Sequence, residues 1–105
     1  VRRGVRTMAD AHVYDQDAGT VITIATQAPN LSTATLSILW KKPSGETTTV
    51  SVTTYDESAQ TISWTVTAGF WDEIGIWEGQ ALVYYGSSQM FYGDVFKIDV
   101  RDTLE

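Results

Sequence analysis

Several features that common kinds of protein chemistry require are scarce or missing in this sequence. It has no cysteine, which excludes disulfides, thiolate zinc sites and a thiol nucleophile. Its single histidine, His12, has no second histidine with which to build a multi-histidine metal site, and no Ser-His-Asp triad is apparent. Glycine-rich phosphate loops and nucleophile motifs are also missing. We therefore expect no metal, no cofactor and no enzymatic activity.

Long hydrophobic runs and positive charge are scarce as well. No apolar run approaches the roughly 20 residues of a membrane span, so no membrane association is predicted. Seven Lys and Arg face thirteen Asp and Glu, for a net charge of −6. Because Arg2, Arg3 and Arg6 all lie at the start, the rest of the chain carries −9. An acidic body repels phosphate backbones, which predicts that the globular part does not bind nucleic acid.

Short segments in which apolar and polar residues alternate account for most of the chain. This period of two is typical of half-buried strands. Turn-forming residues such as Pro-Asn, Pro-Ser-Gly and Gly-Ser-Ser separate the segments. The predicted strands are Val21–Thr26, Ala34–Lys41, Thr47–Thr53, Thr61–Val66, Ile76–Tyr85 and Met90–Val100, with one more short strand expected within His12–Asp17.

Six or seven antiparallel strands in about 100 residues favour an all-β, immunoglobulin-like sandwich. A small β-barrel is the alternative. We expect residues 12–105 to form this domain. Residues 1–11 show no periodicity and are predicted to form a basic N-terminal arm. Ala68–Gly75 breaks the alternation and is expected to be a crossing connection with room for one helical turn.

The acidic residues offer little that points to catalysis or metal binding. Asp15 and Asp17 are two residues apart, but the ordered ligand spacing of a calcium loop is absent. A glycosidase needs two carboxylates at a set separation across a cleft, and a sandwich of this size leaves little room for one. We therefore expect acidic turn residues to cap and solvate their turns.

Aromatic residues occur in three adjacent pairs: Phe70-Trp71, Tyr84-Tyr85 and Phe91-Tyr92. Neighbours in a strand point to opposite faces, so one member of each of the last two pairs should face outward. Gly93 can host a bulge that resets this alternation. Exposed aromatic residues fill protein interfaces, stack on sugars or simply cover a sheet edge. The candidate subunit contacts are Arg2, Arg3, Arg6, Trp71, Tyr84 and Tyr92.

Several short stretches follow one another in a recognisable order: Asp17–Ile22, Trp40–Thr47, Ile62–Gly69 and Ile74–Val83, then Tyr92-Gly93 near the last strand. Together they resemble the immunoglobulin-like domains of bacteriophage tail and baseplate proteins, in particular the N-terminal domain of baseplate upper proteins. The resemblance covers roughly residues 15–100. It departs from the family pattern at Ile74-Gly75-Ile76, where the usual Pro and Thr are missing.

The resemblance implies a non-enzymatic virion component, made in the host cytoplasm, that packs into rings or lattices with itself and with other virion proteins. The expected role is particle assembly, in a tail, baseplate, neck or capsid decoration. Edge strands, exposed aromatics and the N-terminal arm would make the contacts. The alternative is a carbohydrate-binding module that uses exposed aromatics for attachment to a host surface.

Overall fold

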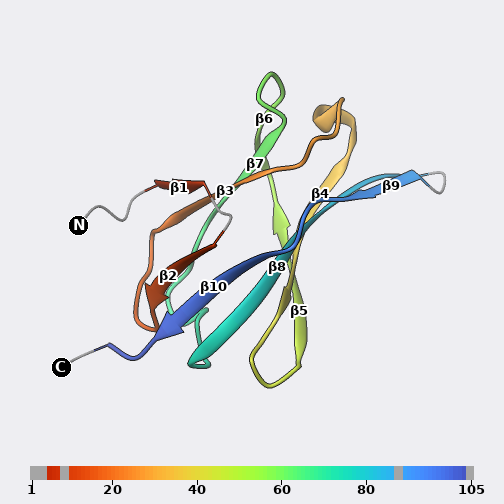
Figure 1. Ribbon diagram of the computed structural model, residues 1–105. Coiled ribbons are helices and arrows are strands. Elements are labelled where there is room, and N and C mark those ends of the chain that lie inside the picture. The colour runs from red at the N-terminus through yellow and green to blue at the C-terminus, as the bar shows by residue number, and fades with distance from the viewer. Residues whose placement is uncertain (1–4, 8–9, 87–88, 104–105) are drawn as a thin grey trace.

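The computed structural model describes residues 5–7, 10–86 and 89–103, with side chains described from residue 12 onward. Its strands form two sheets that make a sandwich (Figure 1). The first sheet has the order β1 (Val5–Thr7), β3 (Val21–Ala25), β7 (Thr61–Thr65) and β6 (Thr54–Asp56). The second has the order β2 (Asp10–Tyr14), β10 (Phe96–Arg101), β8 (Gly75–Gly86), β4 (Thr35–Lys41) and β5 (Thr47–Val52), and β9 (Gln89–Tyr92) also pairs with β8.

Strands β4 and β8 show how the alternating sequence builds the core. Every second residue of β4 is buried, and those between are more exposed. Strand β8 follows the same rule from Trp77 to Val83. The two strands pair antiparallel, so their apolar faces coincide. With β3, β7 and β10 they supply most of the buried core, which includes Ile22, Ile24, Leu36, Ile38, Trp40, Ile62, Trp77, Ala81, Val83, Phe96, Ile98 and Val100.

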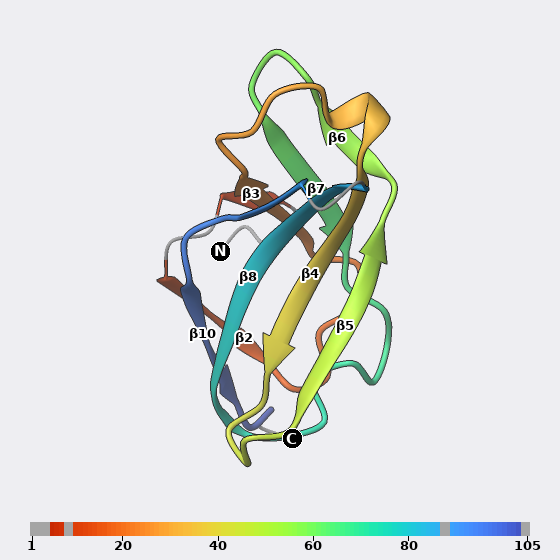
Figure 2. The ribbon, with the colours of Figure 1, turned by 90° about the vertical axis from the view of Figure 1, so that its right-hand side faces the viewer.

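The strand order is that of an immunoglobulin-like sandwich, as the sequence predicts. Such domains place strands A, B, E and D in one sheet and strands G, F and C in the other, with C′ beside C in larger members. Here β1, β3, β7 and β6 hold the first set of positions, and β10, β8, β4 and β5 hold the second (Figure 2). Trp40 lies on β4, at the strand C position where immunoglobulin domains carry a buried Trp, and it is 1% exposed.

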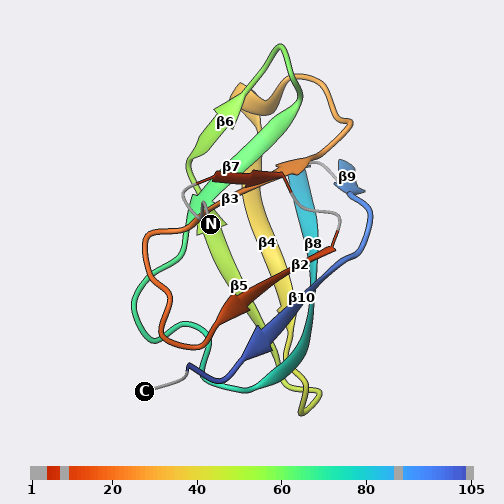
Figure 3. The same ribbon diagram turned by 60° about the vertical axis from the view of Figure 1, so that its left-hand side comes forward.

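The N-terminal segment differs from the expectation of a free arm. Strand β1 pairs in parallel with β3, and β2 pairs in parallel with β10 (Figure 3). Residues 5–7, 10 and 11, which belong to the predicted arm, therefore lie in paired strands. Backbone N–H and C=O groups can extend a sheet edge without any alternation of apolar side chains, so these strands carry no period-two signal. Residues 1–4, 8 and 9 lie outside the described residues.

Three smaller differences concern turns and connections. Thr54–Asp56, which lies between the predicted strands Thr47–Thr53 and Thr61–Val66, forms β6 and pairs with β7. The last predicted strand is divided into β9 and β10 by residues 93–95. Residues 68–75 contain no helical turn, whereas a short 3₁₀ turn forms at Leu31–Thr33.

Aromatic rings fill one end of the core, which we call the tryptophan end: Trp40, Phe70, Trp71, Trp77 and Phe96. The ring of Trp40 lies 5.4 Å from those of Trp71 and Phe96, in edge-to-face contact with both. Such pairs add about 0.5–1.5 kcal/mol beyond the area that they bury. The indole Nε1 atoms of Trp40 and Trp71 have no hydrogen-bond partner in the described structure. Packing, rather than hydrogen bonding, therefore holds these two rings.

Gly79 makes this packing possible. A Cβ atom at this position would lie 2.4 Å from Cζ of Phe96 and 2.8 Å from Cζ3 of Trp40. Both distances are far shorter than a normal carbon contact of about 3.5–4.0 Å. The two rings therefore occupy the space that any other residue at this position would fill.

Polar contacts fasten the connection between β7 and β8 over the tryptophan end. The indole Nε1 of Trp77 donates to the carbonyl oxygen of Glu73 at 2.9 Å. Lys42 Nζ, in the turn between β4 and β5, donates to the carboxylate of Asp72 at 2.9 Å. The backbone N–H of Ser44 donates to Glu73 Oε1 at 3.0 Å. These bonds tie two loops together and close this end of the sandwich.

Candidate binding surface

An exposed apolar surface lies on the hairpin of β8 and β9. Tyr84, Met90, Phe91 and Tyr92 are exposed by 42%, 47%, 48% and 54%, respectively. We call these four residues the hairpin surface. All four residues of β9 are exposed. The hairpin projects away from the rest of the sandwich (Figure 1).

Strand pairing decides which way these side chains point. Met90 pairs with Tyr84, and Tyr92 pairs with Leu82. Since residues opposite each other in a sheet share a face, these four lie on the outer face of the second sheet. Phe91 pairs with the buried Val83 and so lies on the core side. It is nevertheless half-exposed, because β9 lies at the edge of the sheet and pairs with β8 alone among the described strands.

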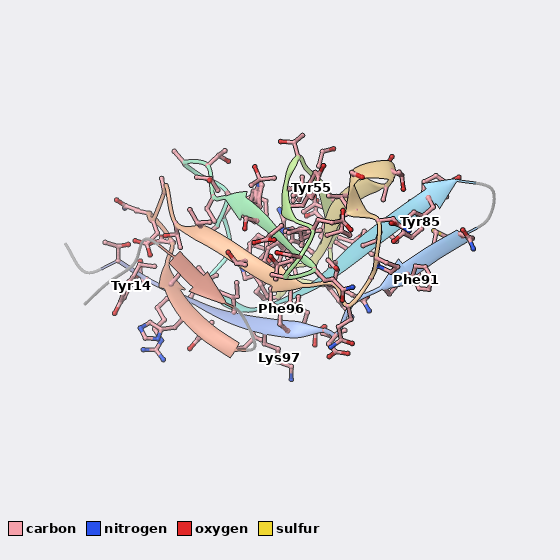
Figure 4. All side chains as sticks on the ribbon, turned by 90° about the horizontal axis from the view of Figure 1, so that it is seen from above. Tyr14, Tyr55, Tyr85, Phe91, Phe96 and Lys97 are labelled. Carbon is pink, nitrogen blue, oxygen red and sulfur yellow. The ribbon has the colours of Figure 1, made fainter. Side chains whose placement is uncertain are left out.

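Tyr85 anchors the hairpin to the body of the domain. Its hydroxyl donates a hydrogen bond to the carbonyl oxygen of Pro29, in the loop between β3 and β4. Its ring packs edge-to-face on Phe91, with 5.7 Å between the centroids. Figure 4 shows Tyr85 and Phe91 on the projecting strands, at a distance from Phe96. The sequence assigns no special role to Tyr85, and its partner 56 positions away in the chain gives no local signal.

Hydrogen bonds also fix the base of the hairpin. Gln80 Nε2 donates to the carbonyl oxygen of Gly93 at 2.9 Å. The N–H of Gly93 donates to the carbonyl oxygen of Ala81 at 3.0 Å. A Cβ atom on Gly93 would lie 3.3 Å from Cβ of Ala81, so the backbones approach closely here. The exposed side chains are thus presented from a fixed base.

The neighbouring loop is held by a carboxylate. Glu57, in the turn between β6 and β7, accepts hydrogen bonds from the N–H groups of Leu31 and Ser32 at 3.3 and 3.2 Å. Thr26 adds a backbone hydrogen bond to Gln60 at 2.8 Å. The turn itself is ordered by Asp56, whose pKa is lowered mainly by the hydrogen bond from the Ser58 side chain. The loops beside the hairpin therefore form one connected support.

A shallow groove lies on the outer face of the second sheet. Its volume is about 380 Å³. Its floor and walls come from β4, β5 and β8 and from Val95, which is 56% exposed. The lining side chains include Leu39, Lys41, Thr47, Thr49, Glu78 and Gln80. The groove offers hydroxyl, amide and charged groups beside apolar ones, which suits a polar ligand or an extended chain.

Charge is distributed unevenly around this surface. The four basic side chains in the described part of the domain are Lys41, Lys42, Lys97 and Arg101, and they lie on β4, β10 or the turn after β4. Strand β9 carries no charged residue. The hairpin surface is therefore apolar and uncharged, on a domain whose net charge is strongly negative.

The predicted contact residues differ in their exposure to solvent. Tyr84 and Tyr92 are exposed, as the sequence predicts. The expectation that Trp71 lies at the surface is wrong, since it is only 2% exposed. It lies in the connection after β7, where strand alternation gives no guide, and it folds into the core against Trp40 and Trp77. Arg2 and Arg3 lie outside the described residues, and only the backbone of Arg6 is described, in β1.

The two carboxylates considered for calcium are engaged within the domain. Asp15 Oδ1 accepts hydrogen bonds from the N–H and the hydroxyl of Thr103 at 3.0 and 2.7 Å. The hydroxyl contact is the largest of the causes that lower the pKa of Asp15. Asp17 Oδ2 accepts a hydrogen bond from the N–H of Tyr14 at 3.0 Å. Across the described residues, no group of three or more His, Cys, Asp or Glu is placed to hold a metal ion.

Comparison with known protein families and with curated proteins finds no match to this chain. Within the described residues, no helix has the length and apolar character needed to cross a membrane.

Proposed function

We propose that this chain is a non-enzymatic structural protein of a bacteriophage particle and acts in particle assembly. The observation that carries the proposal is the hairpin surface: four large side chains, about half-exposed, on a hairpin with a fixed base. Exposed Tyr and other large apolar residues are the common anchors of protein interfaces. A tail, baseplate, neck or capsid decoration offers many identical neighbours for such a surface.

The placement of the motif glycines supports the resemblance to phage tail and baseplate domains. Gly19, Gly45, Gly69 and Gly75 have φ values of 84°, 98°, 80° and 132°. Side chains rarely tolerate this region, so each of these positions favours glycine. The motifs therefore mark turns that the fold needs, in the order in which the resemblance places them.

The basic N-terminal residues are a second proposed contact. Arg2, Arg3 and Arg6 concentrate positive charge ahead of an acidic domain. In an assembly, they would lie against the acidic body of a neighbouring subunit, an attraction that salt weakens.

Recovery from purified particles tests the proposal. We expect the chain to co-purify with the virion at a fixed ratio to the other structural proteins, as measured by quantitative mass spectrometry. The double change Tyr84→Ala and Tyr92→Ala should lower its incorporation at least tenfold. Tyr55→Ala is the matched control, because Tyr55 is also exposed, by 41%, but lies on β6 in the other sheet. Absence of the parent chain from purified particles would contradict the proposal.

Carbohydrate binding is the second candidate function. It is favoured by one observation: Tyr84 and Tyr92 share the outer face of the second sheet with the groove lined by Thr49 and Gln80. Aromatic faces beside hydroxyl and amide groups are suited to sugars. Titration calorimetry against host-surface glycans checks this function. Saturable binding that disappears with Tyr92→Ala would support it, and heat changes no larger than dilution would oppose it.

A further inference from the structure

The free edge of β9 is the feature that the domain leaves most open to a partner. Strand β9 pairs with β8 on one side, and no described strand pairs with its other side. Strand β10 pairs with the first half of β8, on the same side of β8 as β9. The other side of β10 is paired with β2. Half of the N–H and C=O groups of a strand point to each side, so β9 presents unpaired groups outward.

The edge strands β5 and β6 lack this combination of unpaired backbone and apolar side chains. Strand β5 presents Thr47, Thr49 and Ser51 to solvent, and β6 has three residues and ends at Asp56. Proteins usually protect an apolar edge with Lys, Pro or a bulge on the edge strand. Residues 89–92 include neither Lys nor Pro. The register shift between Tyr84 and Gly86 leaves the extra residue on β8, the paired strand.

We infer that β9 is a self-association site, at which two copies of this chain join their second sheets by antiparallel pairing of β9 with β9. The inference deepens the proposed assembly role and rests on it. The distribution of charge indicates that the partner is a second copy of this chain. Two copies with net charge −6 repel one another over most of their surfaces, but residues 89–92 contribute no charge to the contact. An uncharged apolar edge is where like-charged copies meet at the lowest electrostatic cost.

The orientation of the side chains restricts the register. Met90 and Tyr92 face outward, whereas Phe91 faces the core side. A two-fold axis perpendicular to the sheet keeps the outer faces of both copies on the same side. Residues that lie opposite each other must therefore share an orientation, so the pairing is centred on a residue and not between two. The register that we propose is centred on Phe91: Phe91 opposes the partner's Phe91, and Met90 opposes the partner's Tyr92.

The exposed area predicts a weak contact. A large aromatic side chain offers roughly 150–250 Å², so four half-exposed side chains present roughly 400 Å² per copy. A stable interface buries about 800 Å² per partner. We therefore expect a dissociation constant of roughly 10 µM to 1 mM, which many simultaneous contacts in a particle would strengthen.

Sedimentation velocity of the purified chain tests the inference. Between about 10 µM and about 1 mM, the parent should shift reversibly from monomer to dimer. Phe91→Lys should remain monomeric, because a charge is then placed at the two-fold axis. Tyr55→Lys, which changes an exposed aromatic of another edge strand, should dimerise like the parent. A parent that stays monomeric at about 1 mM would overturn the inference, as would a Phe91→Lys variant that dimerises normally.

The register has its own test, because the chain has no cysteine to interfere. Under mild oxidation, Phe91→Cys should form a disulfide-linked dimer on non-reducing gels, since identical residues oppose each other there. Tyr55→Cys should remain mainly monomeric. Equal cross-linking of both variants would refute the register. Loss of the dimer on changing Arg2 and Arg3 to Ala, but not with Phe91→Lys, would point to the N-terminal residues instead and overturn the inference.

These outcomes separate the inference from the proposed function. A chain that is found in particles but never dimerises leaves the assembly role intact and removes the β9 contact. A chain that dimerises through β9 but is absent from particles keeps the β9 contact and removes the assembly role.

Discussion

The tryptophan end and the hairpin surface use large apolar side chains in opposite ways. At the tryptophan end, Trp40, Trp71 and Trp77 are no more than 2% exposed and pack edge-to-face on one another. At the hairpin surface, Phe91 and Tyr92 are about half-exposed. The two regions lie on the same long strand, because Gly79 pairs with Trp40 and Tyr84 pairs with Thr35. Five residues along a strand separate them, a distance of about 17 Å.

Position at the sheet edge explains the difference. Strand β8 lies between β4 on one side and β10 or β9 on the other, whereas β9 pairs with β8 alone among the described strands. Phe91 is level with the buried Val83 and with Leu36 of β4, but it lies on this edge strand and stays half-exposed although its orientation is that of a core residue. The comparison teaches that position in the sandwich, and not residue type, decides whether an aromatic side chain stabilises this fold or remains available to a partner.

The largest expected effect comes from emptying the tryptophan end. Trp40→Ala should lower the free energy of unfolding by about 3–5 kcal/mol, because it removes the ring that contacts every other member of the cluster. Urea titration followed by circular dichroism measures this loss. Trp40→Phe is the control and should lose clearly less, since the Trp40 indole N–H makes no hydrogen bond. A loss below about 1 kcal/mol in Trp40→Ala would show that the cluster does not hold the fold.

Adding volume at the tryptophan end should lower the free energy of unfolding by less than removing volume there. Gly79→Ala is expected to destabilise by about 1–3 kcal/mol, because the new methyl group meets Phe96 and Trp40. Combining Gly79→Ala with Phe96→Leu should recover part of this loss, because the smaller side chain frees the space that Cζ of Phe96 occupies. Gly93→Ala, where the nearest atom lies 3.3 Å away, should change stability by about 1 kcal/mol or less. Equal losses at Gly79 and Gly93 would contradict this account of the packing.

The hydrogen bonds between Thr103 and Asp15 lie outside both regions. Removing one of them should give the smallest expected change in stability, and that change should depend on pH. Hydrogen bonds from Thr103 lower the pKa of Asp15 in the folded state. The contribution to stability is therefore present above the unfolded pKa of about 3.9 and is lost as the pH falls through the folded pKa. Thr103→Val removes the hydroxyl bond, so the pKa of Asp15 should rise and the loss of stability below about pH 4 should become shallower. NMR titration of the Asp15 carboxyl group checks the shift, and an unchanged pKa would contradict the assignment.

Alternation of apolar and polar residues predicts the strands that form the core. It does not predict a strand that joins a sheet through backbone pairing alone, or the orientation of a side chain in a connection. Strands β4 and β8 were predicted nearly to their ends, because one face of each is buried and the other exposed. Strand β1 was missed, since it joins the sheet through backbone pairing. Trp71 was misplaced at the surface because it lies in a connection, where no periodicity reports orientation. Alternation predicts that one member of each of the pairs Tyr84-Tyr85 and Phe91-Tyr92 faces outward, but the exposure of Phe91 depends on its place on the edge strand β9.

The most direct test of the division between the two regions is the stability of a chain whose hairpin surface has been truncated. We expect the combined change Met90→Ala and Tyr92→Ala to leave the free energy of unfolding within about 0.5 kcal/mol of the parent, as measured by urea titration. The same variant should lose dimerisation. A loss of stability above about 2 kcal/mol would contradict the account, because these side chains would then be part of what holds the domain together.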